Sequence, residues 1–405
     1  MSNILWGLGG MFTIFLIAII FSTNRKAINW RTVAGGLAIQ ITFAFLVFVT
    51  TWGQNILQYM SQSVNNLIGY TTEGIEFLYG PLINHENMGM MFAFQVLPTI
   101  IFFSSLIAVL YHLGIMQKVI MLIGGLLSKV LGTTKVESIN AAGNIFVGQT
   151  EAPLLIRPFI SRITKSELFA VMTGGFTSIA GSTLVGYTLL GIEVEYLLAA
   201  SFMAAPAALV LAKLFVPEVE PHHEVIEDVA PEESDTTNVF DAIAGGAVTG
   251  LKLAVNIGAI LLSFIALLAL LNGIIGWVGN LFDVAITLEK ILGYLLAPLA
   301  FVIGVPWDEA VRSASFIGQK IVTNEFVAFS GLGEVKDELS KKAEVVTTFA
   351  LTGFGSLSGI GVQIGALGGM APDRRKDVAN LGLRAVIAAT LANLLSASIA
   401  GMFLF

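Results

Sequence analysis

The chain has 405 residues, of which 55% are hydrophobic and only 12% are charged. Soluble domains carry about 25% charged residues, so this composition excludes a mostly water-exposed surface and favours an integral membrane protein. The net charge of −7 offers no basic surface for nucleic acid. The lack of cysteine excludes disulfides and thiolate metal sites.

Apolar stretches predict about eight membrane-spanning helices, because a span needs about 20 apolar residues. The expected spans are Ile4–Phe21, Thr32–Trp52, Phe92–Leu113, Leu168–Leu190, Tyr196–Phe215, Val248–Val278, Val345–Leu367 and Val378–Phe405. No Lys or Arg precedes the first stretch, so we interpret it as a retained helix rather than a cleaved signal. We expect Pro98 to break or kink the third span. We expect Glu289–Ile303, which is too short to cross, at the membrane surface.

Two segments between the spans differ in character. Asn55–Gly80 places Ile56, Met60 and Leu67 at helical spacing among polar residues, which predicts an amphipathic helix at the membrane surface. Pro217–Asp235 is acidic and contains a pair of histidines, His222 and His223. We interpret it as a solvated loop rather than a metal site.

Lys and Arg gather in short loops between the spans, and such loops face the cytoplasm. The clusters are Arg25, Lys26 and Arg31, then Arg157, Arg162 and Lys165, then Arg374, Arg375 and Lys376. This predicts an inner (plasma) membrane protein with both termini outside.

A weak internal duplication is the most informative feature. The first half reads Gly-Gln-Thr-Glu-Ala-Pro at residues 148–153 and continues into a Thr-Gly-rich span at residues 173–181. The second half reads Gly-Gln-Lys at residues 318–320, Asn-Glu-Phe-Val-Ala at residues 324–328 and a Thr-Gly-rich span at residues 352–359. Such duplications are typical of secondary transporters, whose sites lie between the repeats near the bilayer midplane.

The segments before those spans predict re-entrant hairpins. Ala141–Ile156 and Ser313–Phe329 are apolar but interrupted by Gly and polar residues, so neither makes a good crossing. The Thr-Gly-rich spans predict broken helices, because glycine permits unwinding. The expected organisation is an N-terminal scaffold at residues 1–90, a first repeat at 91–216, an acidic cytoplasmic loop at 217–240 and a second repeat at 241–405.

Two glutamates at membrane depth, Glu151 and Glu325, indicate a functional site. An ionisable residue within a span costs roughly 2.5–3.5 kcal/mol on insertion scales and is normally kept for a pathway or site. The alternatives are that both lie outside the membrane at hairpin ends, or that they pair with Lys320.

Other polar and aromatic residues have two interpretations each. Gln149 and Thr150 suit the edge of a base or a hydrogen bond between helices. Phe354 suits stacking on a ring or packing in the core. Asn144 and Ser178 suit a small hard cation through oxygen ligands, which taken singly is a weak signal.

At these residues the chain resembles the concentrative nucleoside transporter family. The motifs that carry the resemblance lie at residues 148–153 and 318–328, with further likeness at residues 94–99 and 368–372. The resemblance covers the chain from about residue 30 to the end. It implies an eight-span core with two re-entrant hairpins, a homotrimer with one nucleoside site per protomer, and an elevator-type motion. No nucleic-acid partner and no enzymatic activity are implied.

The resemblance also implies residue roles. The substrate-binding positions would be Gln149, Thr150, Glu151 and Thr183 on the side of the nucleobase, and Asn324, Glu325, Phe354 and Ser356 around the ribose and ring. Sodium would lie between the first hairpin and the next broken helix, at Asn144, Val147, Ser178 and Ile179, two by side chain and two by carbonyl.

One departure from the family pattern affects the sugar end. Family members often read Gly-Phe-Ala-Asn-x-x-Ser in the second broken helix, where this chain has Ser356 in place of Asn and Gly359 in place of Ser. Both changes shrink the side chains around the ribose. We expect purine nucleosides to be accepted at least as well as pyrimidine nucleosides.

The sequence therefore predicts import of nucleosides coupled to a cation, with Na⁺ as the first choice. Proton coupling, with Glu151 or Glu325 as carrier and no bound metal, is the alternative. A passive channel and a membrane enzyme acting on lipid are remote alternatives.

Overall fold

The computed structural model describes residues 3–83, 91–220 and 236–404, and within them it is all helical, with no strand. This confirms the predicted all-α class. Seven of the described helices are long and apolar enough to cross a membrane, or up to eight if one bent pair is counted as a span. The prediction of about eight spans is compatible with this range.

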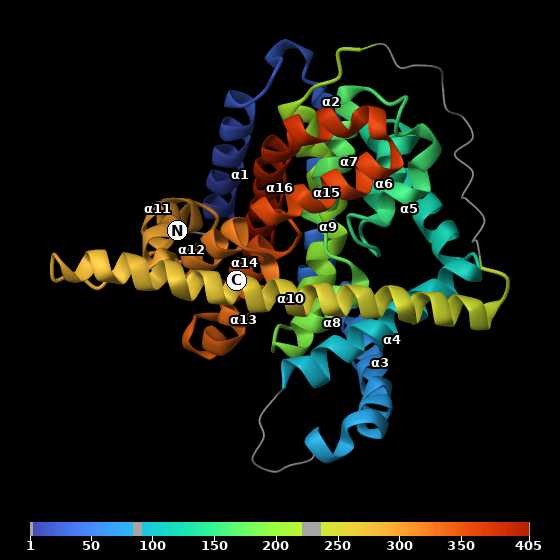
Figure 1. Cartoon of the computed structure of the whole chain (residues 1–405). Helices are drawn as coiled ribbons and strands as arrows, with labels where there is room; N and C mark the ends of the chain where they lie inside the picture. The colour runs from blue at the N-terminus through green and yellow to red at the C-terminus, as the bar shows by residue number, and fades with distance from the viewer. Residues whose placement is uncertain (1–2, 84–90, 221–235, 405) are drawn as a thin grey trace.

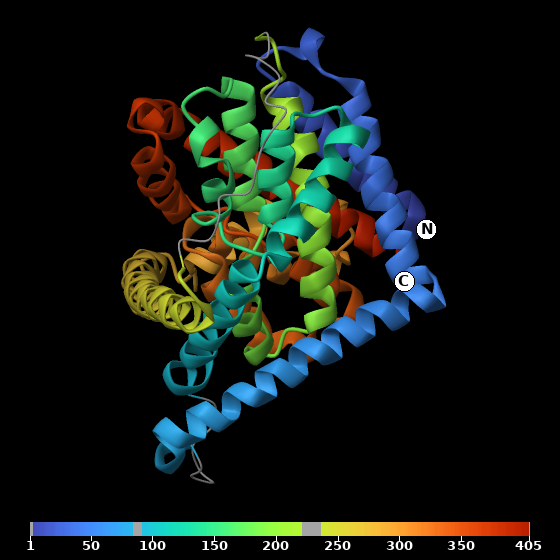
Figure 2. The same cartoon turned by 90° about the vertical axis from the view of Figure 1, so that its right-hand side faces the viewer.

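The N-terminal helices and one very long helix form the outer part of the molecule. α1 (Asn3–Ile20) and α2 (Trp30–Val49) are followed directly by α3 (Thr51–Ile83), which runs obliquely to the bundle in Figure 2. α4 (Phe92–His112) continues through Pro98 as one helix, which excludes the break that was one of the two outcomes expected there. α10 (Val239–Asn280) is 42 residues long, packs along α4 and crosses the front of the bundle in Figure 1.

Two helical hairpins lie inside this frame. The first consists of α6 (Lys135–Gly143) and the short helix η2 (Ala152–Phe159), with its tip at residues 148–151, and the second of α12 (Trp307–Val322) and α13 (Glu325–Val335), with its tip at residues 324–325. α5 (Ile115–Leu131) precedes the first hairpin and α11 (Leu288–Val302) the second, and α11 and α12 are bent by 117° at a turn in which Gly304 has a φ of +119°. This left-handed backbone suits glycine and reverses the chain.

The predicted hairpin segments contain both tips. Ala141–Ile156 runs from the end of α6 into η2, and Ser313–Phe329 runs from α12 into α13. Glu289–Ile303 corresponds to α11, which packs along α12. Its expected position at the membrane surface stays a prediction.

Both Thr-Gly-rich spans are broken helices, as predicted. α7 (Lys165–Thr177) and α8 (Gly181–Leu189) are separated at residues 178–180. α14 (Lys341–Leu351) and α15 (Leu357–Met370) are separated at residues 352–356. These separations are the first break and the second break below.

Two further helices complete the core. α9 (Val194–Phe215) and α16 (Arg375–Phe403) pack against the broken helices and against each other. Most of the residues of both helices are buried.

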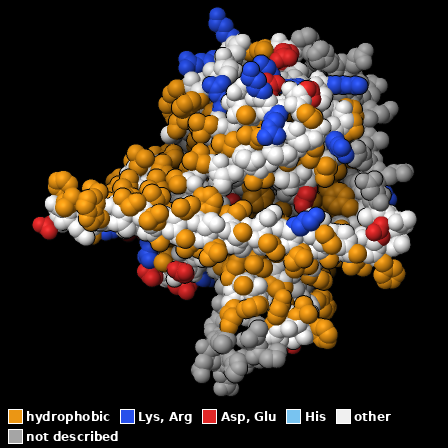
Figure 3. Space-filling model, in the orientation of Figure 1, with side chains coloured by type: hydrophobic (Ala, Val, Ile, Leu, Met, Phe, Trp, Pro, Cys, Tyr) orange, Lys and Arg blue, Asp and Glu red, His pale blue; other side chains and the backbone are white. Residues whose placement is uncertain are grey.

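The outer surface is strongly apolar. Figure 3 shows hydrophobic side chains over α10 and the neighbouring helices, and Leu262 and Trp277 of α10 are 75% and 67% exposed. Such a surface suits lipid rather than water. Most of the acidic loop, with His222 and His223, falls outside the described residues.

Candidate substrate and cation site

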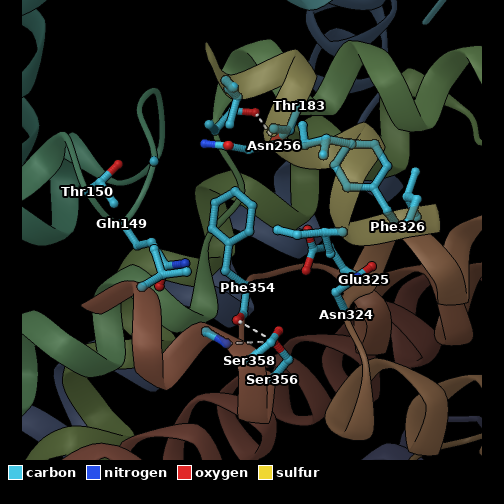
Figure 4. Close-up of a pocket in the computed structure, with 18 of the residues that line it drawn as sticks. Gln149, Thr150, Thr183, Asn256, Asn324, Glu325, Phe326, Phe354, Ser356 and Ser358 are labelled. Carbon is cyan, nitrogen blue, oxygen red and sulfur yellow. Dashed lines mark hydrogen bonds between the residues drawn. The ribbon is translucent and has the colours of Figure 1, made fainter. Parts of the chain in front are cut away.

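The tips of the two hairpins and the two breaks meet at one cavity of about 360 Å³ (Figure 4). Four helices that are distant in the sequence, α8, α10, α13 and α15, contribute to its wall. All eight residues that the sequence singled out for substrate line it: Gln149, Thr150, Glu151, Thr183, Asn324, Glu325, Phe354 and Ser356.

The first tip is a tight turn held by its own glutamate. Oε2 of Glu151 accepts a hydrogen bond from the backbone N–H of Gly148 at 3.0 Å. The turn packs against α7 at Gly175, where an added Cβ would lie 2.9 Å from Cβ of Gln149. Gln149 is buried, and its Oε1 has no hydrogen-bond partner among the described residues. An acceptor therefore remains available at the wall of the cavity.

The second tip presents a carboxylate at the start of a helix. Oδ1 of Asn324 caps α13 by accepting from the N–H of Val327 at 3.0 Å, and its buried Nδ2 has no partner among the described residues. Glu325 is the first residue of α13, where the positive end of the helix dipole favours a negative charge. Its Oε1 accepts from the hydroxyl of Tyr187 at 3.2 Å.

Glu325 is thus buried at the cavity and not at a solvent-exposed hairpin end. No described ion pair joins either glutamate to Lys320. Pairing with Lys320, which the sequence left open, is not what the structure shows.

The two breaks touch each other beneath the cavity. The N–H of Phe354 donates to the carbonyl of Ser178 at 3.3 Å. Gly353 has a φ of +109°, and an added Cβ would lie 2.3 Å from the carbonyl oxygen of Thr177. Only glycine allows the two breaks to come this close. Their contact places the ring of Phe354 between the two tips, as Figure 4 shows.

The predicted cation residues lie on adjoining segments behind the first tip. Asn144 and Val147 follow α6, and Ser178 and Ile179 form the first break. The segments are joined because Gly181 N–H donates to the carbonyl of Phe146 at 2.9 Å. All four residues are buried.

Asn144 shows that this place fits a small cation. Its Oδ1 is buried without a hydrogen-bond partner among the described residues, and a hard cation takes such oxygens as ligands. The first break also frees backbone carbonyls at the C-terminal end of α7. No group of three or more His, Asp or Glu that could hold a metal ion occurs in the described part of the chain.

Two polar residues of the cavity wall were not singled out by the sequence analysis. Asn256 of α10 lines the cavity close to Thr183, together with apolar residues of α10. Ser358 of α15 donates to the carbonyl of Thr323 at 2.9 Å and ties the second break to the second tip. Asn256 is a polar residue within a long apolar run, which is a usable signal. Ser358 had no comparable signal.

Family models match nearly the whole chain. The model described as Na⁺ dependent nucleoside transporter C-terminus matches residues 196–401, and the corresponding N-terminus model matches residues 9–82. Between them, a model described as nucleoside recognition matches residues 93–192. That last segment contains the first hairpin and the first broken helix.

Similar proteins come from bacteria and mammals. The uncharacterised transporter YutK of Bacillus subtilis is 54% identical, over 99% of this chain and 100% of that protein. The nucleoside permease NupC of Helicobacter pylori is 44% identical, over 99% and 98%. Human sodium/nucleoside cotransporter 1 is 40% identical, over 95% of this chain and 62% of that protein.

A solved structure supports the same relationship. CNTnw in an inward-facing, substrate-bound state is 50% identical, with a TM-score of 0.95 over 99% of this chain and 98% of that one. Family models, relatives and structure agree along the whole length. The chain is a multi-pass membrane protein that belongs to the concentrative nucleoside transporter family, whose members are nucleoside transporters and not enzymes.

Proposed function

We propose that the protein imports nucleosides by symport with Na⁺. The observation that carries this proposal is the convergence of both hairpin tips and both breaks on one cavity, with a carboxylate from each repeat at its wall. A site shared by the two repeats suits alternating access, because motion of the repeats changes the side from which the site opens.

Polar atoms without partners support a nucleoside as the ligand. Oε1 of Gln149 would accept a hydrogen bond from the base, and Nδ2 of Asn324 would donate one to a sugar oxygen. The carboxylate of Glu325 would accept from ribose hydroxyls, a charge-assisted bond that is stronger than a neutral one. The ring of Phe354 would stack on the base.

The sugar end supports acceptance of purine nucleosides. Ser356 Oγ is engaged as the cap of α15, accepting from the N–H of Gly359 at 3.2 Å. Its short side chain leaves more room than an asparagine would, and Gly359 adds no side chain. Competition uptake with inosine, guanosine, uridine and cytidine tests this. Uridine transport that excess inosine leaves untouched would contradict it.

Sodium would bind between the first tip and the first break, through Asn144, Ser178 and the carbonyls beside them. Sodium must favour the nucleoside-loaded state, since without differential affinity there is no coupling. The membrane potential would add about 2.3 kcal/mol per charge per 100 mV. If protons rather than sodium drive transport, the carboxylate of Glu151 or Glu325 would carry the proton.

We further propose an inner-membrane homotrimer with both termini outside. In this arrangement α1 to α4 and α10 form a fixed scaffold. The hairpins and broken helices then move across the membrane as one transport unit, in an elevator-type motion.

The test is radiolabelled nucleoside uptake into proteoliposomes, with an inward gradient of sodium or of choline at fixed pH. We expect saturable, sodium-dependent uptake. Glu325→Gln should lower it at least about a hundredfold, because the ribose loses its charged acceptor. Glu334→Gln, an exposed change in the same helix, is the matched control. Undiminished uptake in choline would rule out sodium and favour protons, and uptake without saturation would favour a channel.

A further inference from the structure

A buried lysine beside the second break has no part in the site described above. Lys320 lies in the last turn of α12, and its side chain is fully buried. It does not line the cavity, and none of the ion pairs among the described residues includes it. Burying an ammonium group without a carboxylate is costly. Glu325 interacts with this charge electrostatically, but no described carboxylate lies within ion-pair distance of it, so the ammonium group depends on other acceptors.

The ammonium group binds the C-terminal end of α14. Nζ of Lys320 donates to the carbonyls of Ala350 at 3.1 Å and Thr352 at 3.0 Å. In an unbroken helix, Ala350 would accept from the N–H of Phe354, but that N–H donates to Ser178 instead. The break thus frees a carbonyl at the negative end of a helix dipole, and the ammonium group satisfies it.

The same charge is linked to the first break. Nζ of Lys320 also donates to Oδ1 of Asn393 in α16 at 3.3 Å. Nδ2 of Asn393 donates to the carbonyl of Thr177, the last residue of α7, at 2.9 Å. Of the helices concerned, α14 packs against both α12 and α16 (Figure 1). The ammonium group of Lys320 therefore links the C-terminal ends of α14 and α7, binding α14 directly and α7 through Asn393.

The first repeat has its candidate cation ligands in the corresponding place. Asn144 caps the end of α6, the first helix of the first hairpin, and lies against the last turns of α7, where a Cβ on Gly174 would be 3.4 Å from its Nδ2. Lys320 likewise lies in the last turn of α12, the first helix of the second hairpin, and contacts the end of α14. In this place the first repeat has the Oδ1 of Asn144, which has no hydrogen-bond partner among the described residues. The second repeat has the ammonium group of Lys320.

We propose that Lys320 is a tethered cation, which holds the end of α14 in the second repeat as the exchangeable cation holds the end of α7 in the first. This inference rests on the sodium coupling proposed above. Because the tethered charge cannot leave, each transport cycle needs one exchangeable cation. Lys320 is a positioning residue, since it acts on the nucleoside through the second break and Phe354.

The test compares wild type with Lys320→Ala and Lys320→Met. Sodium-dependent uptake is measured in proteoliposomes, and thermal unfolding is measured in detergent as NaCl is replaced by choline chloride at constant ionic strength. Wild-type uptake should rise with sodium with a Hill coefficient of about 1 and move about one charge per nucleoside.

The two variants should differ from each other. Alanine leaves three oxygens facing a space that a sodium ion can enter, so the melting temperature of Lys320→Ala should rise more steeply with sodium than that of wild type, with a Hill coefficient of about 2. Methionine fills the space without charge. Lys320→Met should lose at least about tenfold in uptake at every sodium concentration.

Lys213→Met is the matched control, because it removes another buried lysine, which pairs with Glu137 away from the breaks. It should lower the melting temperature equally in both salts. If both Lys320 variants behave like this control, the lysine is merely structural and the proposal is overturned. Two sodium ions per nucleoside in wild type would overturn it too, and that measurement needs no variant. If wild-type uptake does not depend on sodium, the proposed sodium coupling is wrong. The thermal unfolding of Lys320→Ala in the two salts would still decide the role of Lys320.

Discussion

Gly353→Ala tests whether contact between the two breaks holds the site together. The backbone of Gly353 has a φ of +109°, where an L side chain is strained by about 1–3 kcal/mol. The new Cβ would also lie 2.3 Å from the carbonyl oxygen of Thr177 and 2.7 Å from that of Phe176. Both obstacles are backbone atoms, so the two broken helices must separate by roughly 1 Å to restore ordinary contact.

That separation should be measurable as lost stability and lost transport. Strain together with the weakened hydrogen bond from Phe354 to Ser178 should remove roughly 3–4 kcal/mol. For a chain of 405 residues, unfolding entropies of soluble proteins convert this into a melting temperature lowered by roughly 4 °C. Displacement of the Phe354 ring should lower nucleoside uptake at least about tenfold, because small misplacements at a site have large effects.

Gly361→Ala is the control for this change. Gly361 lies in α15, a few residues beyond the second break, and an added Cβ there meets nothing within 4 Å. Alanine should stabilise that helix by up to about 1 kcal/mol. Thermal unfolding in detergent and radiolabelled uptake are measured for both variants. Equal melting temperatures and equal uptake would refute the inference that the breaks must touch.

Three further changes test the site and its support. Tyr187→Phe removes the hydroxyl that donates to Glu325 and should raise the KM for nucleoside by up to about tenfold in uptake assays; an unchanged KM would show that this hydrogen bond does not orient the carboxylate. Asn144→Leu should raise the sodium concentration for half-maximal uptake at least about tenfold, and an unchanged sodium dependence would remove Asn144 from the cation site. Lys213→Met leaves Glu137 buried and without its ion-pair partner, and should lower the free energy of unfolding by about 3–5 kcal/mol. Adding Glu137→Gln should restore part of the lost melting temperature. A double variant that melts no higher than Lys213→Met would contradict the role of the pair.

Local sequence was sufficient to locate the tips and the breaks. Glycine and polar residues within apolar runs are costly in lipid unless the protein encloses them. That cost marks residues 148–151 and 324–325 as tips and residues 352–356 as a break. For the same reason, the candidate substrate residues could be named from their local pattern, although their roles in binding remain predictions.

The parts that the sequence did not predict depend on tertiary packing. α11 is apolar and 15 residues long, and its length alone does not reveal that the chain turns at Gly304 and packs α11 along α12. Asn256 lines the cavity only because α10 crosses the front of the bundle (Figure 1), and no local pattern encodes that crossing.

Unpaired polar atoms link stability to transport. Oε1 of Gln149 and Nδ2 of Asn324 face the nucleoside cavity, and Oδ1 of Asn144 lies at the candidate cation site. Each such buried group costs about 1–3 kcal/mol while it lacks a partner, so the three together lower stability by roughly 3–9 kcal/mol. Nucleoside and cation would each supply partners for their own atoms.

The two ligands should therefore stabilise the protein in a coupled way. The two candidate sites share parts of the chain. Val147, a candidate cation residue, and Gln149, a candidate nucleoside residue, lie in the same short turn at the first tip. The N–H of Phe354, at the nucleoside site, donates to the carbonyl of Ser178, at the cation site. Ordering of this shared segment by one ligand lowers the cost for the second, which is positive cooperativity. We expect nucleoside and sodium together to raise the melting temperature by more than the sum of their separate effects. Strictly additive shifts would mean that the two sites are independent, and an independent cation cannot drive accumulation of the nucleoside.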